Sequence, residues 1–170
     1  MVTGGPQEAV METSVLVNFL AIDRLDLLAA HPYYHFTITN HVRGEITAHY
    51  PEQLGRFEPA LAASWITVTT VDSLNATFVS LASDGRLGVG ECATIAYAID
   101  KTVPVAIDDK QARKAARRLC PTIVLENTES LMVGLVKGAI LNVASADGIK
   151  EDWEKYYRFK LPFGSFADKV

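Results

Sequence analysis

Short runs of β-forming residues alternate with longer helical segments along the chain, and this alternation constrains the fold more than any other feature. The predicted strands are residues 9–11, 35–39, 65–71, 104–107 and 123–125. The predicted helices are residues 15–20, 25–30, 40–50, 51–63, 72–83, 88–100, 109–119 and 128–139. Strands that are separated by helices pair in parallel through right-handed crossovers. We therefore expect a three-layer α/β/α sandwich with a central parallel sheet.

The length and composition indicate one domain with a single sizeable core. The chain has 170 residues, of which 49% are hydrophobic and 21% charged, as is usual for a folded globular protein. We expect residues 1–147 to form the domain, and residues 148–170 to form a C-terminal helix and tail packed on it. Trp153, Tyr156 and Tyr157 lie three and four residues apart there. That aromatic stripe either closes the core or mediates self-association.

Charge and cysteine content exclude several classes of protein. A net charge of −4 excludes a generally basic nucleic-acid coat, so that any contact with nucleic acid must use a local patch. The two cysteines, Cys92 and Cys120, have no CxxC spacing for structural zinc, and free thiols are typical of a reducing compartment. Residues 1–6 lack the features of a secretion signal, and no apolar stretch is long enough to span a bilayer. We expect a cytoplasmic protein that does not enter a membrane.

Four acidic residues that are far apart in the sequence are the candidate catalytic groups: Glu12, Glu45, Glu91 and Asp109. Carboxylates at the ends of apolar strands, or on the inner side of helices, are costly unless a cation accompanies them. A fold that brings them together would form a site for Mg²⁺ or Mn²⁺, which prefer oxygen ligands. The alternative interpretation is that they cap helices or lie on solvated faces.

Polar and basic residues near these acids are candidates for substrate binding. Ser14 and Asn40 either cap helices or hydrogen-bond a carboxylate or phosphate of the site. Five cations share one stripe of the predicted helix at 109–119, namely Lys110, Arg113, Lys114, Arg117 and Arg118. Such a stripe suits a phosphate backbone, although charged stripes are also common on solvated helices.

Two motifs carry a resemblance to a known family. Gly88-Val-Gly-Glu-Cys-Ala-Thr resembles a central motif in which a Gly-x-x-Glu turn starts an Ala-rich helix, and Ala106-Ile-Asp-Asp-Lys-Gln-Ala-Arg resembles a fourth-strand motif. With the segments around Glu12 and Glu45, in this order, they resemble the PIN domain of VapC-type toxin ribonucleases over about residues 8–143. The resemblance implies that Glu12, Glu45, Glu91 and Asp109 form the family's acidic quartet, with Asp108 as a further candidate.

The resemblance implies a Mg²⁺- or Mn²⁺-dependent endoribonuclease, the toxin of a toxin–antitoxin pair, with an RNA substrate, a small antitoxin protein as partner and a homodimeric state. The implied metal ligands are Glu12, Glu91, Asp108 and Asp109. The expected substrate-binding residues are Ser14, Asn40, Lys110, Arg113, Lys114 and Arg117. The family has Asp where this chain has Glu12. Two alternatives therefore stay open: a weakly active or inert PIN-like module that binds RNA or protein, and a nuclease that acts on DNA.

Overall fold

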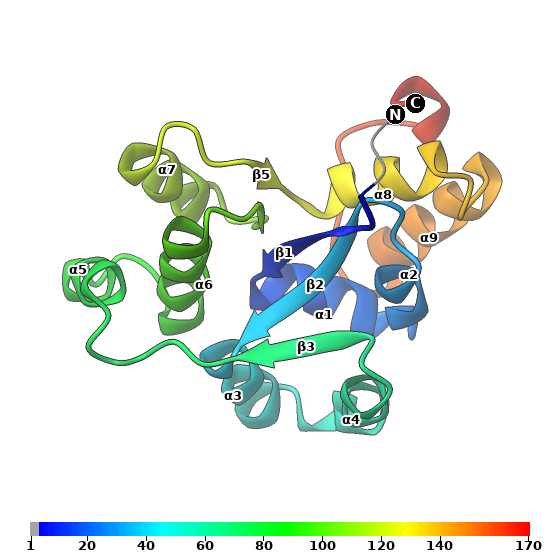
Figure 1. Ribbon diagram of the computed structural model, residues 1–170. Helices are drawn as coiled ribbons and strands as arrows, with labels where there is room; N and C mark the ends of the chain where they lie inside the picture. Colours follow the sequence, from blue (N-terminus) through cyan, green and yellow to red (C-terminus); the bar gives the residue numbers. More distant parts are fainter. Residues whose placement is uncertain (1–3) are drawn as a thin grey trace.

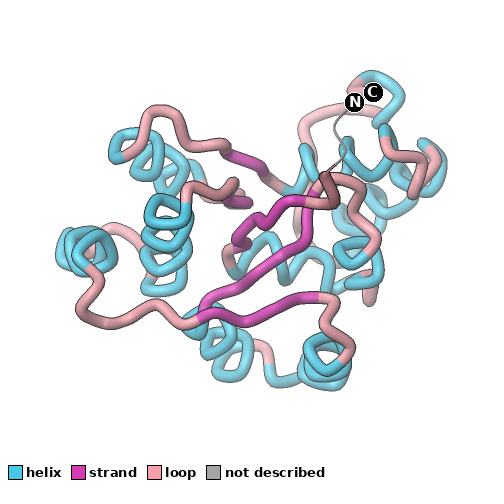
Figure 2. The backbone as a smooth tube through the Cα atoms, in the orientation of Figure 1, coloured by secondary structure: helices cyan, strands magenta, loops and turns pink. Residues whose placement is uncertain are grey.

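The five strands form one parallel sheet at the centre of the molecule. The computed structural model describes residues 4–170; residues 1–3, which belong to the segment where no secretion signal is expected, lie outside the described part. The strands are β1 (Gln7–Met11), β2 (Tyr34–Thr39), β3 (Ile66–Thr69), β4 (Val105–Ala106) and β5 (Leu125–Glu126). Their order in the sheet is β3-β2-β1-β4-β5, and every described pairing is parallel. Figure 2 shows them surrounded by helices.

Helices cover both faces of this sheet, which confirms the predicted three-layer α/β/α sandwich. They are α1 (Thr13–Ala21), α2 (Leu25–Ala29), α3 (Asn40–His49), α4 (Leu54–Ala62), α5 (Ala76–Asp84), α6 (Val89–Lys101), α7 (Lys110–Leu119), α8 (Thr128–Lys137) and α9 (Val143–Tyr156), with short 3-10 turns at Pro51–Gln53 and Phe166–Asp168. In Figure 1, α5, α6 and α7 gather on one side of the sheet, and α1, α2, α8 and α9 lie on the other.

The alternation of side chains along β1 divides the core into two clusters. Ala9 and Met11 pack in the larger cluster with α1, α2, α8 and α9, whereas Val10 packs in the smaller one with α6 and α7. All three side chains are fully buried, because successive residues of a strand point to opposite faces and both faces are covered. Cys92 is also fully buried in the smaller cluster.

The capping alternative is wrong for Ser14 and for Asn40, and one predicted helix start is also wrong. Glu12, rather than Ser14, caps α1, and Thr39, rather than Asn40, caps α3. The helix predicted at residues 72–83 begins later than expected, since Asp72 forms a local turn with Leu74 and α5 begins at Ala76, where Asn75 is the cap. An Asn, Asp or Ser beside a helix start is a good cap only when its backbone is extended there. In each case, another side chain occupies that position.

The C-terminal helix packs tightly on the domain. It begins at Val143, earlier than the predicted boundary at residue 148. Trp153 is fully buried and donates from Nε1 to the carbonyl oxygen of Asn18 at 2.8 Å. Tyr156 and Tyr157 remain 61% and 47% exposed. The aromatic stripe therefore closes the core through Trp153 alone. No helix among residues 4–170 has the length and apolar character needed to cross a membrane.

Candidate active site

The acidic residues gather at the carboxyl edge of the sheet. Glu12 directly follows β1, and Asp108 and Asp109 follow β4, its parallel neighbour, so that the two strands deliver these groups to the same edge. Ligand sites of open parallel sheets lie at this edge. A pocket of about 550 Å³ opens there, and it is lined by Glu12, Thr13, Ser14, Glu45, Tyr50, Gly88, Glu91, Asp108 and Asp109. All five predicted acids thus line one pocket.

Helix N-termini hold three of these carboxylates. Glu12 accepts from the backbone N–H of Val15 at 3.3 Å and from the hydroxyl of Ser14 at the start of α1. Asp109 caps α7, and Oε2 of Glu91 accepts from the N–H of Gly88 at 2.9 Å, before α6. The positive end of each helix favours a negative charge beside it. Capping and clustering are therefore compatible, because the caps keep the acids close together.

Glu45 reaches the pocket from α3 because Gly90 leaves room for it. Its Oε1 accepts from the N–H of Gly90 at 2.9 Å, and its Oε2 accepts from the hydroxyl of Thr13. A side chain at position 90 would occupy the place of this carboxylate, since a Cβ there would lie 2.5 Å from Oε2. Neither Thr13 nor the role of Gly90 was predicted. Gly90 lies in the Gly88-Val-Gly-Glu motif, but the sequence pattern does not show its contact with Glu45.

Asp108 is held by a network that connects three elements. Its Oδ1 accepts from the N–H of Thr128 at 2.8 Å, and its Oδ2 accepts from the Thr128 hydroxyl at 2.6 Å and from Nδ2 of Asn18 at 3.0 Å. Asn18 lies on α1 and Thr128 begins α8. Neither residue was predicted. The available signal was Asn18 itself, a polar residue within the apolar stretch Val15–Leu20.

Burial and the negative charges of neighbouring acids raise the pKa of the Glu12 carboxyl group. The side chain is 3% exposed. Burial raises the pKa of Glu12 to about 7, and the charges of Asp108 and Glu91 act in the same direction, while hydrogen bonds from Ser14 oppose the shift. A carboxyl group that titrates near neutral pH in a pocket with other acids is a candidate for a functional group.

The pKa values of two neighbouring acids, Glu91 and Asp108, are raised as well. Burial raises the pKa of Glu91, and the negative charges of Asp109 and Glu45 add to this effect, against the hydrogen bond from Gly88. Burial also raises the pKa of Asp108, although its hydrogen bonds lower it. The pocket therefore concentrates negative charge that the protein stabilises only in part, which is the electrostatic condition for binding a cation.

The donor set suits a hard divalent ion, although the arrangement is not yet a closed coordination shell. Five carboxylates supply the oxygen ligands that Mg²⁺ and Mn²⁺ prefer. Within the described part of the chain, no three His, Cys, Asp or Glu side chains are close enough together to hold an ion as they stand. An ion would require the flexible ends of these side chains to turn toward one another. The chemistry of the donors fits a divalent metal, and their spacing requires such closure.

Two of the predicted substrate-binding residues have other roles in the structure. Arg113 donates from its NH1 group to the carbonyl oxygens of Ile107 at 2.8 Å and Glu126 at 2.7 Å, so it joins the ends of β4 and β5. Asn40 accepts from the N–H of Val71 at 2.9 Å and does not line the pocket. These contacts tie one nitrogen of Arg113 and the amide oxygen of Asn40 to the backbone, and the role of both residues in substrate binding stays a prediction. Ser14 does line the pocket.

The remaining predicted cations lie outside the carboxylate pocket. Lys110, Lys114 and Arg117 are exposed on α7. Together with Arg113 and Leu125 they line a separate hollow of about 240 Å³ between α7 and β5. Since Asp109 caps α7, the stripe begins at the carboxylate pocket and runs away from it.

Comparisons with known proteins identify the type of domain. A family described as "PIN domain" matches residues 8–124. A PilT N-terminus domain protein, SSO1118, from the hyperthermophilic archaeon Sulfolobus solfataricus P2 is 18% identical, with a TM-score of 0.48 over 74% of this chain and 90% of that one. VapBC2 from Rickettsia felis, solved bound to a DNA fragment from its promoter, is 14% identical, with a TM-score of 0.48 over 71% of this chain and 98% of that one. No curated protein matches the chain.

Proposed function

The chain belongs to the PIN domain family, and from this premise we propose that it is a metal-dependent endoribonuclease that hydrolyses RNA phosphodiester bonds in its carboxylate pocket. PIN domains are in general metal-dependent nucleases. The observation that carries the proposal is the convergence of Glu12, Glu45, Glu91, Asp108 and Asp109 from separate segments on one pocket of about 550 Å³. Such a cluster is stabilised when a cation binds to it.

The present contacts of Asp109 and Glu91 indicate which of their oxygen atoms would hold the ion. Asp109 uses Oδ1 to cap α7, and Glu91 uses Oε2 to accept from Gly88, so we assign Oδ2 of Asp109 and Oε1 of Glu91 to the ion. When bound, a divalent ion would lower the pKa of the attacking water and would neutralise the charge that develops on the leaving oxygen. We assign Mg²⁺ or Mn²⁺ to this position on the oxygen donors alone.

Glu12 and Glu45 shape the site around that position. Without a bound ion the pKa of Glu12 lies near 7, so a cation that favours the ionised carboxylate would displace a proton from this group. Ser14 donates to Oε1 of Glu12, which fixes one oxygen and leaves Oε2 to face the ion or the attacking water. Glu45 is held by Thr13 and Gly90, and from there it would orient water or a ligand.

The proposal is tested by Asp109→Asn, with cleavage of a mixed-sequence single-stranded RNA measured in Mn²⁺. Asn is as good a helix cap as Asp, so this variant keeps the N–H contact of Ala112 and its stability while it loses the negative charge. We expect cleavage to fall at least about a hundredfold, on the scale of a mispositioned catalytic group. Unchanged cleavage by a folded Asp109→Asn variant would overturn the assignment.

One observation favours a second candidate, a PIN domain that binds RNA without cleaving it. Glu12 stands where the family has Asp, and its carboxyl group folds back on the first turn of α1. Mg²⁺ requires nearly octahedral geometry, which a longer side chain disturbs. A wild-type protein that is inactive in Mn²⁺, together with an active Glu12→Asp variant, would establish the second candidate in place of the first.

We also propose that the chain is the toxin of a toxin–antitoxin pair, acting as a homodimer with a small protein antitoxin. The support is the resemblance of its motifs to VapC-type proteins, together with its membership of the family. Co-expression with the product of an adjacent small gene tests this proposal. Growth arrest by the chain alone, and its relief by that product, are the expected results.

A further inference from the structure

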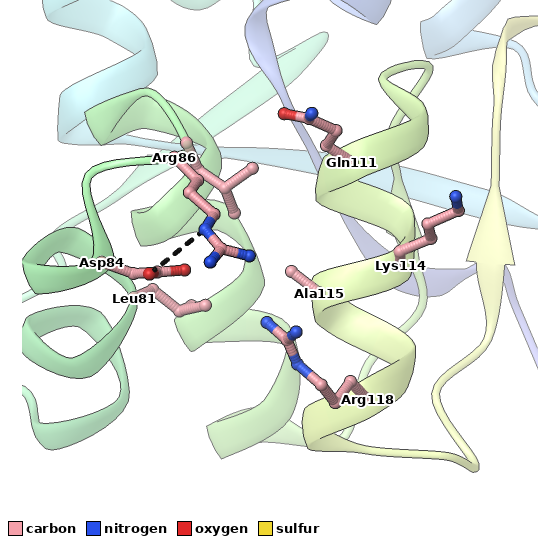
Figure 3. A pocket seen from close by; sticks show the side chains of 8 residues that line it. Leu81, Asp84, Arg86, Gln111, Lys114, Ala115 and Arg118 are labelled. Atoms are coloured by element: carbon pink, nitrogen blue, oxygen red, sulfur yellow. Dashed lines mark ion pairs between the residues drawn. The ribbon is translucent and has the colours of Figure 1, made fainter.

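A second pocket lies on the other flank of α7, outside the carboxylate site. It has a volume of about 240 Å³ and is lined by Leu81, Asp84, Arg86, Leu87, Gln111, Lys114, Ala115 and Arg118. In Figure 3, the guanidinium groups of Arg86 and Arg118 extend into the space between α7 and the turn that follows α5. Arg86 was not among the residues predicted from the sequence, and Arg118 was predicted only as a member of the cationic stripe of α7.

The pocket has a cationic rim and an apolar floor. Arg86, Lys114 and Arg118 contribute three positive charges, and Asp84 contributes one negative charge. Asp84 forms an ion pair with Arg86 at 3.4 Å, while no ion pair of Lys114 or Arg118 occurs among residues 4–170. The excess positive charge therefore lies on α7. Arginine guanidinium groups bind phosphate in a planar, bidentate manner and also stack on flat rings.

The size of the pocket indicates what kind of ligand it accepts. Pockets for whole small molecules usually enclose about 300–1,000 Å³. A pocket of about 240 Å³ is smaller, and it suits one unit of a longer chain. An anionic unit with a flat apolar part would place its charge between the two arginines and its ring against Leu81 and Ala115, which is the chemistry of a nucleotide.

The position of the pocket relative to Asp109 supports a nucleic-acid strand over a separate small molecule. Lys114 and Arg118 follow the cap residue of α7 by five and nine positions. At about 1.5 Å per residue, they lie roughly 7.5 Å and 13.5 Å along the helix axis from the carboxylate pocket. Lys114 also lines the hollow on the β5 side, so the cationic surface continues across α7.

We propose that the pocket between Arg86 and Arg118 binds a nucleotide of single-stranded RNA that is distant from the cleaved bond. This inference rests on the proposed nuclease function for its choice of nucleic acid. The pocket would anchor one end of the strand, and the carboxylate pocket would act on the other. Asp84 moderates the affinity, because its carboxylate competes with phosphate for Arg86.

Binding without catalysis tests this proposal most sharply. The probe is a fluorescent 12-nucleotide single-stranded RNA of mixed sequence, and its affinity is measured by anisotropy in EDTA. We expect Arg118→Ala and Arg86→Ala each to weaken binding about two- to fivefold, the scale of one exposed ion pair. For Arg118→Ala, the slope of log affinity against log salt should decrease by about 0.7, the value for one phosphate contact on a single strand.

Two further variants serve as controls. Asp84→Asn removes the competing carboxylate and should strengthen RNA binding about two- to fivefold. Arg24→Ala removes a cation that precedes α2, on the other side of the sheet, where Arg24 pairs with Asp26, and it should leave affinity unchanged. Affinities that are equal for wild type, Arg118→Ala and Asp84→Asn would overturn the proposal. A polyglutamate peptide of equal charge that binds as tightly, with the same loss in Arg118→Ala, would overturn it in favour of an acidic protein partner.

Cleavage assays separate this proposal from the nuclease assignment. A dinucleotide substrate is too short to reach from the carboxylate pocket to Arg118, so Arg118→Ala should cleave it at the wild-type rate and cleave the 12-nucleotide RNA more slowly. If no substrate is cleaved by any variant, the nuclease assignment fails while the anisotropy results still decide the nucleotide pocket. Equal loss of activity on both substrates would contradict a role that depends on a distant nucleotide.

Discussion

The carboxylate of Glu45 occupies the space that a side chain at position 90 would fill. A Cβ on Gly90 would lie 2.5 Å from Oε2 and 2.6 Å from Oε1 of Glu45. The N–H of Gly90 donates to Oε1 at 2.9 Å, so that the same residue both admits and holds the carboxylate. Gly90 is therefore a requirement of the site and not of the helix in which it lies.

We predict that Gly90→Ala lowers activity while it preserves the fold. The three heavy atoms nearest to the added methyl group all belong to the flexible end of Glu45, which can turn away at little cost. Ala also stabilises a helix by about 0.5–1 kcal/mol relative to Gly. The expected result is an unchanged or higher melting temperature with cleavage reduced about a hundredfold, as for a group displaced by about 1 Å.

Gly44→Ala is the matched control for this substitution. Gly44 lies in α3 and would meet nothing within 4 Å, so it receives the same methyl group without a clash. Its activity should equal that of wild type. Full activity in Gly90→Ala would show that the position of Glu45 does not matter to the reaction.

The raised pKa of Glu12 predicts how stability depends on pH. The carboxyl group has a pKa of about 7 in the folded protein, against an ordinary value of 4.5, so the folded state holds its proton more tightly. The protein therefore loses stability as pH rises between about 4.5 and 7, by about 3 kcal/mol for a shift of this size. The Gln side chain of Glu12→Gln is neutral at every pH, so this variant does not lose stability through ionisation at position 12.

Urea unfolding at pH 5 and pH 8, in EDTA, measures this difference. The free energy of unfolding of wild type should decrease toward pH 8 more than that of Glu12→Gln, and the variant should be the more stable protein at pH 8. The pKa values of Glu91 and Asp108 are also raised, and Glu12 is not among the causes. A smaller pH dependence of stability should therefore remain in the variant. Parallel curves for the two proteins would show that Glu12 is not perturbed in this way.

Arg113 is predicted to contribute to stability. Its guanidinium group joins the carbonyl oxygens of Ile107, which follows β4, and Glu126, the last residue of β5. Arg113→Ala leaves both acceptors without this donor and should cost about 2 kcal/mol, measured by chemical unfolding. Lys114→Ala, on the next position of α7, removes an exposed cation and should change stability by less than about 0.5 kcal/mol. Equal stability of the two variants would contradict the role of Arg113.

The fold could be predicted well from the sequence, because this fold depends on patterns that are local and repeated. Alternating strands and helices imply the parallel sheet, and this sheet brings the acids that follow β1 and β4 to one edge. The caps of α1 and α3 could not be ranked, because Glu12 and Ser14, or Thr39 and Asn40, are chemically plausible alternatives within two residues. The choice depends on backbone angles that only the folded chain defines.

The remaining errors concern contacts between distant residues. Arg113 belongs to a cationic stripe by its spacing, yet its head group reaches the carbonyl oxygen of Glu126, thirteen residues away. The hydrogen bonds of Asp108 to Asn18 and Thr128 cross 90 and 20 residues. Periodicity describes one element at a time, so it cannot show which polar group meets another across the sheet.

We propose that the carboxylates of one pocket share a divalent cation. Anomalous diffraction from crystals grown with Mn²⁺ tests this directly. We predict a manganese peak between Glu91 and Asp109, with Glu12 or Asp108 turned toward it, and loss of that peak in crystals of Asp109→Asn. A map from manganese-containing crystals that has no peak in this pocket, or has its only peak elsewhere on the surface, would contradict the claim.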